Sequence, residues 1–466
     1  MGRINTIISA LLTGLCYQFF WPGMLVAFIP LFKVKLTKST FFIWGIVYMA
    51  CIHAFLINLM DDTHFLVALM LWLICAIYFG AFYGIGGLIL NKIQTYQSKS
   101  WVLFMPVIWP IIEFTKQWGT YGNPNGNLGF SLSEIIHYIP ATSLIGYMGL
   151  GISILFINIA LFQWRLNNHR KYLLIIPITT FFLLALKSPT QFKSTGIQLS
   201  VIQSGIEQNK KMRPALWPSI EAFYINEIKN STGNLIILPE TILPTDIKPY
   251  GTFNKIQHLS NKKDIAILVG SFIFKEEKIF NGSYFIQPNI NPILYKKRRL
   301  MPFGETLPFR KFMSKFIPHQ LLFNDFSLGI ASVHIPYKNA IISPLICLEG
   351  VDNNAYRGPE NQLVTILANN AWFNKSNAGQ LLTKFAHIYA ASYQIPVIIA
   401  ANYGKSIIIN HQGKALKTVA HHKEAQLNET ILVNSQPSFY SRWPWIGSTI
   451  LLIFWGIFNL WGKRSI

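Results

Sequence analysis

The sequence has 466 residues, of which 51% are hydrophobic and only 13% are charged. Soluble domains usually carry about 25% charged residues, so this composition excludes a fully soluble protein, and 14% aromatic residues exclude a disordered one. The net charge of +21 alone would be typical of a nucleic-acid-binding protein. However, 28 of the 40 basic and 15 of the 19 acidic residues lie in 187–442, so the flanks are almost uncharged.

Apolar runs fill both flanks. They lie at 4–20, 21–32, 40–60, 65–90, 101–114, 139–164 and 172–186 before the polar segment, and at 445–461 after it. A single membrane span needs about 20 apolar residues. The first two runs are short and meet at Trp21-Pro22, which predicts a tight hairpin or two shallow re-entrant helices. The flanks therefore predict a multi-pass α-helical membrane bundle of about eight helices, seven in 1–190 and one in 441–466.

The loops between these runs predict the orientation, because basic residues concentrate in cytoplasmic loops. If the N-terminus is cytoplasmic, eleven basic residues lie inside and one outside. The inside loops hold Arg3, Lys33, Lys35, Lys38, Lys92, Lys99, Arg165, Arg170, Lys171, Lys463 and Arg464, and the outside loops hold Asp61, Asp62, Lys116 and Glu134. This bias places 187–442 outside the cytoplasm, which in a bacterium is the periplasmic side of the inner membrane. Its basic surface then either meets anionic phospholipid headgroups or is simply solvated, and no nucleic-acid partner is expected.

From residue 196 the pattern changes to short β-rich runs between helical stretches. Strands are predicted at 196–202, 235–238, 266–271, 283–287, 340–347, 364–368, 397–401, 407–409 and 431–434, and helices at 219–229, 255–261 and 381–393. Several strands are apolar on both faces, as in a sheet that is covered by helices. We therefore expect an α/β or layered α+β domain over 191–440, with a mostly buried sheet.

Three segments of this domain deliver reactive side chains at the ends of strands or loops. They are the strand that stops at Pro239-Glu240, the basic run 296–299 that leads to Glu305, and the strand that ends at Cys347 with Glu349 two residues later. Taken singly, each has an ordinary explanation: a solvated carboxylate, a surface basic patch and a buried structural cysteine. Cys347 is nevertheless the one cysteine outside the apolar runs, which contain Cys16, Cys51 and Cys75. A lone thiol in an oxidising compartment favours a catalytic role.

The three segments together favour acyl transfer. A thiol needs a base to become a nucleophilic thiolate, and a lysine can stabilise the oxyanion that forms when the thiolate attacks a carbonyl carbon. The order Glu240, Lys297 and Cys347 resembles the Glu-Lys-Cys triad of the nitrilase superfamily. This resemblance implies an α-β-β-α sandwich for the polar domain.

With membrane helices on both sides of that domain, the chain resembles more narrowly the apolipoprotein N-acyltransferase family. The likeness rests on Leu238-Pro239-Glu240, Tyr295-x-Lys297, Leu300-x-Pro302-Phe303-Gly304-Glu305, Cys347-x-Glu349 and Asn369-Asn370-Ala371-Trp372-Phe373, and less strongly on Pro124 and Gly129-Phe130-Ser131. It implies that a fatty acyl chain moves from a membrane phospholipid, with phosphatidylethanolamine as the expected donor, to a thioester on Cys347. The implied acceptor is the α-amino group of the diacylglyceryl-cysteine of an apolipoprotein.

The same resemblance implies roles for individual residues. The implied catalytic residues are Glu240, Lys297 and Cys347, the supporting residues are Glu305 and Glu349, and the implied substrate-binding residues are Trp372, Asn369 and Tyr295. No metal and no cofactor are implied, and the expected state is a monomer in the bacterial inner membrane.

The sequence differs from the family pattern at several positions. An aromatic residue of the family is Met212 here, its loop aspartate is Asn370, and its helix glutamate is Ser392. Two other functions therefore stay open: a membrane-tethered nitrilase-type amidase, which uses water as the acceptor, and a non-catalytic paralogue that binds lipid or lipoprotein. A transferase with a different amine acceptor stays open as well.

Overall fold

The structure is a computed structural model that describes residues 2–58, 65–96, 100–167, 175–188, 190, 196–313, 315, 325–373, 376, 378–434 and 436–461. The chain divides into two compact units. Unit 1 comprises Met1–Pro189, Phe373–Gln394 and Pro437–Ile466, and unit 2 comprises Thr190–Trp372 and Ile395–Gln436. The expected domains 1–190, 191–440 and 441–466 stay a prediction; in the structure, residues 373–394 group with unit 1.

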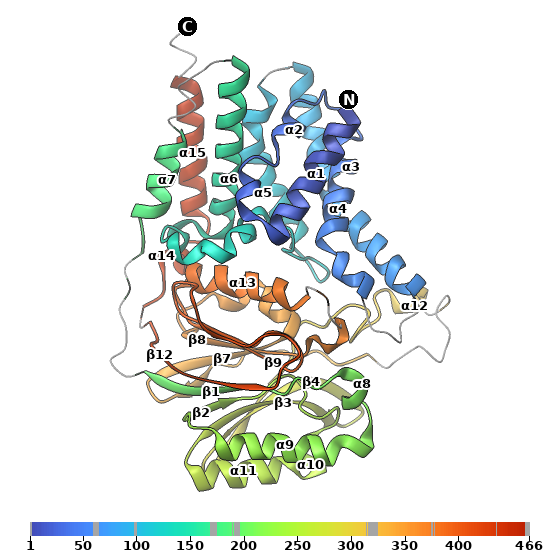
Figure 1. Cartoon of the computed structure of the whole chain (residues 1–466), viewed down its shortest axis with the longest axis vertical. Helices are drawn as coiled ribbons and strands as arrows, with labels where there is room; N and C mark the ends of the chain where they lie inside the picture. Colours follow the sequence, from blue (N-terminus) through green and yellow to red (C-terminus); the bar gives the residue numbers. More distant parts are fainter. Residues whose placement is uncertain are drawn as a thin grey trace. The chain divides into compact units, whose positions relative to one another are not determined.

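Unit 1 is helical (Figure 1). Its elements are α1 (Gly2–Phe19), η1 (Trp21–Leu25), α2 (Ile29–Phe32), α3 (Thr40–Ile52), η2 (Ala54–Asn58), α4 (Phe65–Tyr96), η3 (Trp101–Phe104), α5 (Met105–Lys116), η4 (Leu128–Tyr138), α6 (Thr142–Asn167), α7 (Ile175–Ala185), α13 (Ala378–Tyr393), α14 (Phe439–Arg442) and α15 (Ile446–Trp461). The predicted break at Trp21-Pro22 is present, because α1 ends at Phe19 and Pro22 lies in the first turn of η1.

Two of the described helices are long and apolar enough to cross a membrane, Phe65–Tyr96 and Thr142–Trp164. The other apolar helices in the described ranges have 10–17 residues: Trp21–Phe32, Thr40–Ile52, Ile175–Ala185 and Ile446–Leu460. The predicted total of about eight spans therefore stays a prediction. Of the loop charges behind the predicted orientation, Asp61, Asp62, Lys99, Arg170, Lys171, Lys463, Arg464 and the side chain of Arg165 lie outside the described residues.

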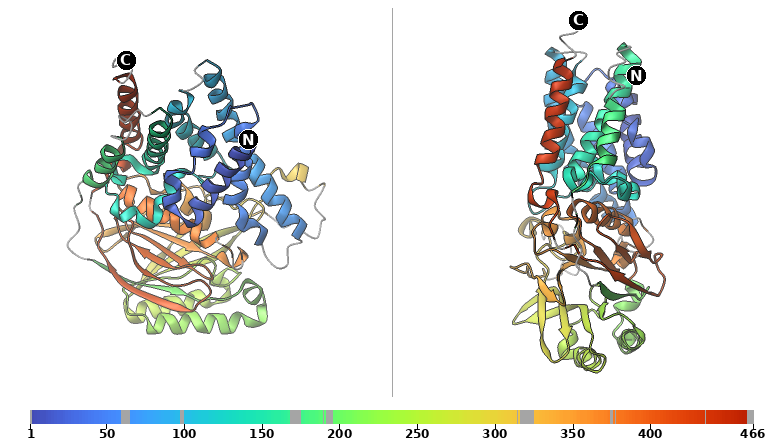
Figure 2. Two further views of the ribbon diagram at one scale, coloured as in Figure 1. Left: turned by 45° about the horizontal axis from the view of Figure 1, so that its top comes forward. Right: turned by 90° about the vertical axis from the view of Figure 1, so that its left-hand side faces the viewer.

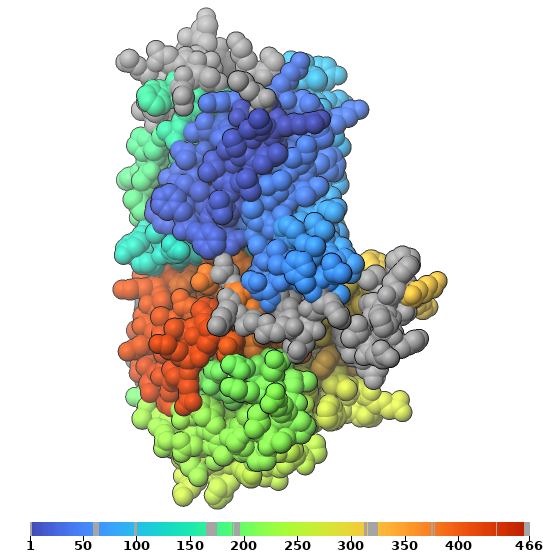
Figure 3. All heavy atoms as spheres, turned by 45° about the vertical axis from the view of Figure 1, so that its right-hand side comes forward, coloured from blue at the N-terminus to red at the C-terminus, as the bar shows by residue number. Residues whose placement is uncertain are grey.

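Glycines let α3 and α4 approach each other closely. A Cβ atom on Gly80 of α4 would lie 2.7 Å from the backbone nitrogen of Ile46, and one on Gly45 of α3 would lie 2.5 Å from the Gly80 carbonyl oxygen. Small residues favour helix association in lipid, because they allow close van der Waals packing of the backbones. α4 lies on the face of unit 1 that Figure 3 shows, and its exposed side chains include the apolar Phe65 and Leu66.

The last helix of the chain packs beside a helix from its first half. In α15, Trp455 stacks on Phe156 of α6 with ring centroids 4.6 Å apart, and Ser448 Oγ donates to the Ile145 carbonyl oxygen at 3.1 Å. The two helices run side by side in the views of Figure 2. The final apolar run is therefore an integral part of unit 1.

Unit 2 contains two six-stranded sheets, with the strand orders β12-β1-β2-β3-β4-β5 and β11-β10-β9-β8-β7-β6. The strands are β1 (Ile197–Gln203), β2 (Leu235–Ile237), β3 (Ala266–Lys275), β4 (Lys278–Gln287), β5 (Ile290–Lys296), β6 (Ile335–Tyr337), β7 (Ala340–Ile346), β8 (Leu363–Ala368), β9 (Val397–Ala401), β10 (Ile407–Ile409), β11 (Ala415–Thr418) and β12 (Ala425–Ile431). The helices are α8 (Gln208–Lys211), η6 (Pro214–Leu216), α9 (Trp217–Asn230), α10 (Ile247–Tyr250), α11 (Thr252–Lys263), α12 (Arg310–Met313), η8 (Cys347–Val351), η9 (Asn353–Tyr356) and η10 (Asn370–Phe373), which extends by one residue into unit 1.

Alternate residues of the first sheet enter two different cores, as the two-residue repeat of a strand requires. In β2, Leu235 and Ile237 face a core that the two sheets share, whereas Ile236 faces a second core formed with α9 and α11. Figure 1 shows these two helices along the outer side of that sheet. These are three layers of the expected α-β-β-α sandwich, and α13, which connects β8 to β9, groups with unit 1.

Most of the predicted strands are present, and one is wrong. The predicted strand 431–434 lies too late in the chain, because β12 ends at Ile431. Strands β5, β6 and β11 were not predicted. The three predicted helices correspond to α9, α11 and α13.

Both sheets contain three neighbouring parallel strands. β1, β2 and β3 are parallel in the first sheet, and β7, β8 and β9 are parallel in the second. In α/β folds the carboxyl ends of parallel strands are the usual position of a ligand site. Glu240 follows β2, Cys347 follows β7 and Asn369 follows β8, so the fold places the predicted site residues at such ends.

Candidate active site

Glu240 lies three residues beyond the end of β2, with 7% of its surface exposed. Thr241, the next residue, has a φ of 43°, which turns the chain sharply behind the carboxylate. The neighbouring strand β3 passes very close at this point. A Cβ atom on Gly270 would lie 2.5 Å from the Pro239 carbonyl oxygen and 2.7 Å from the Glu240 Cα atom. Glycine at position 270 therefore leaves room for the segment that carries Glu240.

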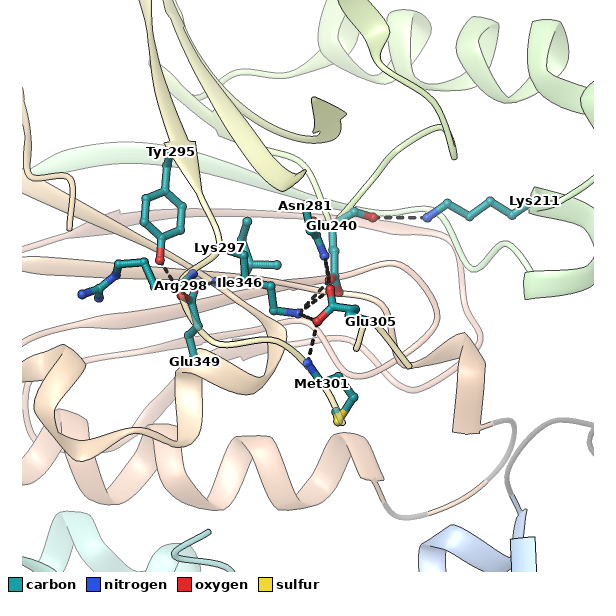
Figure 4. A network of polar contacts seen from close by, with 10 residues as sticks. All are labelled: Lys211, Glu240, Asn281, Tyr295, Lys297, Arg298, Met301, Glu305, Ile346 and Glu349. Atoms are coloured by element: carbon teal, nitrogen blue, oxygen red, sulfur yellow. Dashed lines mark hydrogen bonds and ion pairs between the residues drawn. The ribbon is translucent and has the colours of Figure 1, made fainter. Parts of the chain in front are cut away.

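Lys297 follows β5 and is buried, with 1% of its surface exposed. Its Nζ atom lies 2.8 Å from Glu305 Oε2 and 3.6 Å from Glu240 Oε1, so one ammonium group lies between two carboxylates (Figure 4). The basic run around it points elsewhere, since Lys296 places its Nζ atom 3.8 Å from the centre of the Phe280 ring. The extended segment thus turns Lys296 and Lys297 to opposite sides.

Asn281 of β4 belongs to the same cluster, although it was not among the predicted site residues. Its Nδ2 atom donates to Glu240 Oε1 and to Glu305 Oε1, both at 2.7 Å. Its backbone carbonyl accepts from the Lys297 backbone at 2.8 Å. The side-chain amide of Asn281 thus bridges the two carboxylates (Figure 4), and its backbone carbonyl holds the lysine segment. No motif marks this asparagine, because only the pairing of β4 with its neighbours brings it to the site.

Cys347 follows β7 directly and has a φ of 51°, in the left-handed region that non-glycine residues rarely adopt. Strain of this kind is common where a reactive side chain is held in position by its surroundings. Cys347 is half-buried; the charges of Glu240, Lys297 and Glu305 act on its thiol, and the Asn369 backbone N–H lowers the thiol pKa. The structure therefore brings the three predicted catalytic residues and Glu305 into one cluster.

Glu349 connects the nucleophile segment to the lysine segment. Its Oε2 atom accepts from the Ile346 backbone, and its Oε1 atom accepts from the Arg298 backbone and from the Tyr295 hydroxyl, each at 2.7 Å. Figure 4 shows these groups on the side of Lys297 that faces away from Lys211. Tyr295 is 1% exposed and supports Glu349; its expected role as a substrate-binding residue stays a prediction.

The charges of the cluster follow from burial and from mutual contact. Burial raises the pKa of Glu240, Lys297 opposes this rise, and Glu305 adds to it. Burial alone would lower the pKa of Lys297, but Glu305 and Glu240 outweigh that effect and hold it above its ordinary value. Burial and the Glu240 carboxylate raise the pKa of the Cys347 thiol, against the opposing effect of Lys297. At neutral pH the resting site thus holds a protonated thiol beside a charged ammonium, and a base must remove the thiol proton.

The remaining predicted site residues lie in the loop that follows β8. Asn369 is buried, and its side chain donates to Gln208 Oε1 at 3.0 Å and accepts from Asn402 Nδ2 at 3.0 Å. Trp372 is 44% exposed, which leaves its ring free to contact a substrate. Within the described ranges, no three His, Cys, Asp or Glu side chains gather in a way that could hold a metal ion.

Comparison with known proteins adds sequence evidence. Residues 9–160 match the model of the apolipoprotein N-acyltransferase N-terminal domain, and residues 199–444 match the carbon-nitrogen hydrolase model. The chain is 25% identical to the apolipoprotein N-acyltransferase of Shewanella oneidensis, over 85% of this chain and 80% of the relative. It is 24% identical to that of Vibrio cholerae, over 96% of this chain and 94% of the relative.

One relative and one solved structure match a smaller part. The apolipoprotein N-acyltransferase of Campylobacter jejuni is 30% identical over 54% of this chain and 56% of its own length. A CN-hydrolase superfamily protein from Xanthomonas campestris superposes with a TM-score of 0.41 and 16% identity, over 54% of this chain and 96% of that one. The assignment therefore depends on the two sequence models and the long matches, and by these the chain belongs to the carbon-nitrogen hydrolase family, with the apolipoprotein N-acyltransferase N-terminal domain preceding it.

Proposed function

We propose that this chain is a membrane-bound N-acyltransferase of lipoprotein maturation. It moves a fatty acyl chain from a phospholipid to Cys347, and from Cys347 to the α-amino group of the diacylglyceryl-cysteine of an apolipoprotein. Glu240 is the base, Lys297 stabilises the oxyanion, and Glu305 with Glu349 holds these groups in place. No cofactor takes part in this reaction.

In the first half-reaction, Glu240 takes the proton from the Cys347 thiol, and the thiolate attacks an ester carbonyl carbon of the phospholipid. The carbonyl oxygen becomes an oxyanion, which the Lys297 ammonium stabilises. When this intermediate collapses, the bond between the acyl carbon and the glycerol oxygen breaks. The glycerol oxygen takes the proton back from Glu240, so a lysophospholipid leaves and a thioester remains on Cys347.

In the second half-reaction, the free amine of the lipoprotein attacks the thioester carbonyl carbon. Lys297 again stabilises the oxyanion, and Glu240 takes a proton from the attacking nitrogen. The C–S bond then breaks, an amide forms, and the proton held by Glu240 returns to the Cys347 sulfur. The buried lysine, with Glu305 at 2.8 Å and Glu240 at 3.6 Å, suits this role because its charge is already fixed before the oxyanion forms.

One observation favours acyl transfer over the hydrolysis of a soluble amide. The match to the apolipoprotein N-acyltransferase N-terminal domain at 9–160 precedes the match to the carbon-nitrogen hydrolase model at 199–444 in one chain. A hydrolase that acts on a soluble amide has no need of an apolar domain of this size. The thiol, the base and the lysine alone would suit both acyl transfer to an amine and hydrolysis of an amide.

We further propose that the chain crosses the bacterial inner membrane about eight times and acts as a monomer, with unit 2 in the periplasm and phosphatidylethanolamine as the acyl donor. The eleven-to-one distribution of basic loop residues supports this orientation. A thiol site outside the cytoplasm would meet both the outer-leaflet phospholipid and lipoprotein precursors after their export.

The test compares two acceptors of the acyl chain, the lipoprotein amine and water. The purified full-length chain is incubated in mixed micelles with phosphatidylethanolamine that carries a labelled acyl chain, and a synthetic peptide with an N-terminal diacylglyceryl-cysteine is then added. Transfer of label to the peptide amine, at a rate above its release as free fatty acid, is the expected result. Release of fatty acid that the peptide does not suppress would identify a hydrolase instead. Binding of lipid without any label on protein or product would identify a non-catalytic paralogue.

A further inference from the structure

Unit 2 contains a second buried lysine next to Glu240, which the mechanism does not use. Lys211 lies at the end of α8, and 1% of its surface is exposed, whereas Lys210 beside it is exposed and pairs with Glu207 at 3.4 Å. The Lys211 Nζ atom donates to the backbone carbonyl of Glu240 at 3.2 Å. In Figure 4 the Lys211 side chain extends toward Glu240 from the side opposite to Lys297. Glu240 is therefore held between two lysines.

A buried ammonium group without a close carboxylate is costly, so its presence calls for a reason. Among the described residues, Lys211 has no carboxylate within 4.0 Å. Burial lowers the pKa of Lys211 to about 7, although the Glu240 carboxylate opposes this decrease. An apolar side chain of similar length would fill the same volume without this cost.

The other buried residue of α8 contacts the opposite half of the site. Gln208 lies three positions before Lys211, on the same face of the helix. Its Oε1 atom accepts from Asn369 Nδ2 at 3.0 Å, and the Asn369 backbone N–H lowers the pKa of the Cys347 thiol. Thus α8 contacts the segment of the base through Lys211 and the loop beside the nucleophile through Gln208.

We propose that α8 positions the base relative to the nucleophile, and that Lys211 is a positioning residue that keeps Glu240 ionised and aimed at Cys347. The mechanism under "Proposed function" supplies the role of Glu240 as base, so the proposal rests on it. It does not depend on which acyl donor or acceptor is used.

The proposal predicts a specific pH dependence. The groups that face the Glu240 carboxylate are Lys297, Glu305, Asn281, Lys211 and Cys347. Charged Lys211 lowers the pKa of Glu240, so its removal leaves more Glu240 protonated at acidic pH and unable to take the thiol proton. Above about pH 7 Lys211 is itself largely neutral, so its removal has little electrostatic effect there.

The test measures the rate at which iodoacetamide alkylates Cys347 in the full-length chain between pH 5 and 9, read from the mass of the Cys347 peptide. Lys211→Met is expected to slow alkylation below pH 7 about fivefold, the factor that corresponds to about 1 kcal/mol for the lost interaction between the Lys211 and Glu240 charges. It leaves the rate at pH 9 nearly unchanged. Lys211→Arg keeps a charged donor, so it should restore the parent rate of alkylation below pH 7. Lys210→Met is the matched control and should show the parent profile at every pH.

The companion variant Gln208→Leu removes the contact with Asn369 and touches no ionised group. It is expected to slow alkylation by the same factor at every pH. A loss in Lys211→Met that is equal at all pH values, or a profile like that of the parent, would overturn the proposal for Lys211. Since alkylation needs no lipid and no acceptor, failure of the acyl-transfer proposal would leave these profiles intact and would be seen separately.

Discussion

The close passage of β3 behind the base segment gives a direct way to displace Glu240 without changing any charged group. Gly270→Ala adds one methyl group where the Pro239 carbonyl oxygen would lie at 2.5 Å, the Thr241 backbone nitrogen at 2.6 Å and the Glu240 Cα atom at 2.7 Å. Ordinary van der Waals contact for such an atom begins at 3.4 Å. All three neighbours are backbone atoms, so the base segment must move away from β3 by roughly 1 Å.

A shift of this size has two measurable consequences. The free energy of unfolding is expected to fall by about 1–3 kcal/mol, the usual cost of overpacking. The rate of Cys347 acylation in a single turnover with labelled phospholipid is expected to fall about 100-fold, since a misplacement of about 1 Å has that effect on a reacting group. The control is Gly456→Ala in α15, where a Cβ atom would meet nothing within 4 Å.

A third measurement, the alkylation of Cys347, separates a misfolded protein from one in which only Glu240 is misplaced. Gly270→Ala should retain the alkylation of Cys347 by iodoacetamide at pH 9, where hydroxide in solution competes with Glu240 as the base. A folded Gly270→Ala protein that acylates Cys347 at the parent rate would refute the reasoning, because the position of Glu240 would then not limit the reaction.

Three other predictions concern the lysine, the bridging amide and the topology. Lys297→Arg should slow thioester formation by about 10²–10³-fold, because a planar guanidinium cannot place its charge where the ammonium does, whereas Lys296→Ala should stay close to the parent in the same assay. Asn281→Leu removes two hydrogen bonds to carboxylates and a group that lowers the pKa of Glu240. The rate of Cys347 acylation should therefore decline more at pH 6 than at pH 8. An equal loss at both pH values would show that Asn281 does not act on the ionisation of Glu240. A reporter that is active only outside the cytoplasm should be active when fused after Gly196 and inactive at the C-terminal end, and the reverse would overturn the proposed orientation.

The chemistry of the site was predictable because it follows short local patterns. The strand β2 is apolar and ends before Pro239-Glu240, and β7 is apolar and ends before Cys347, so both positions could be identified from the chain alone. Lys297 was singled out of the run 296–299 by its spacing to Glu305, which resembles the lysine segment of the family. The contacts of Glu349 and Asn281 could not be predicted, because they depend on the pairing of strands that are distant in sequence.

The strands that the sequence did not predict are those without a clear apolar pattern. β5 contains Pro292, which is tolerated because β5 is the edge strand of its sheet. All four residues of β11, another edge strand, are exposed, so no face of it is apolar. β12 has mostly polar residues, so the strand was predicted at the apolar stretch 431–434 that begins where β12 ends. All three strands lie at sheet edges, where their residues are only partly buried or fully exposed, and this accounts for these errors.

The acylation of Cys347 tests the central claim most directly. The full-length chain is incubated with phosphatidylethanolamine and no acceptor, digested, and the mass of the Cys347 peptide is measured with and without hydroxylamine. The account predicts an added mass of one fatty acyl chain on this peptide, removed by hydroxylamine, absent from Cys347→Ala and retained when Cys16, Cys51 or Cys75 is replaced by alanine. Turnover by Cys347→Ala at the parent rate, or an acyl group on any other residue, would contradict it.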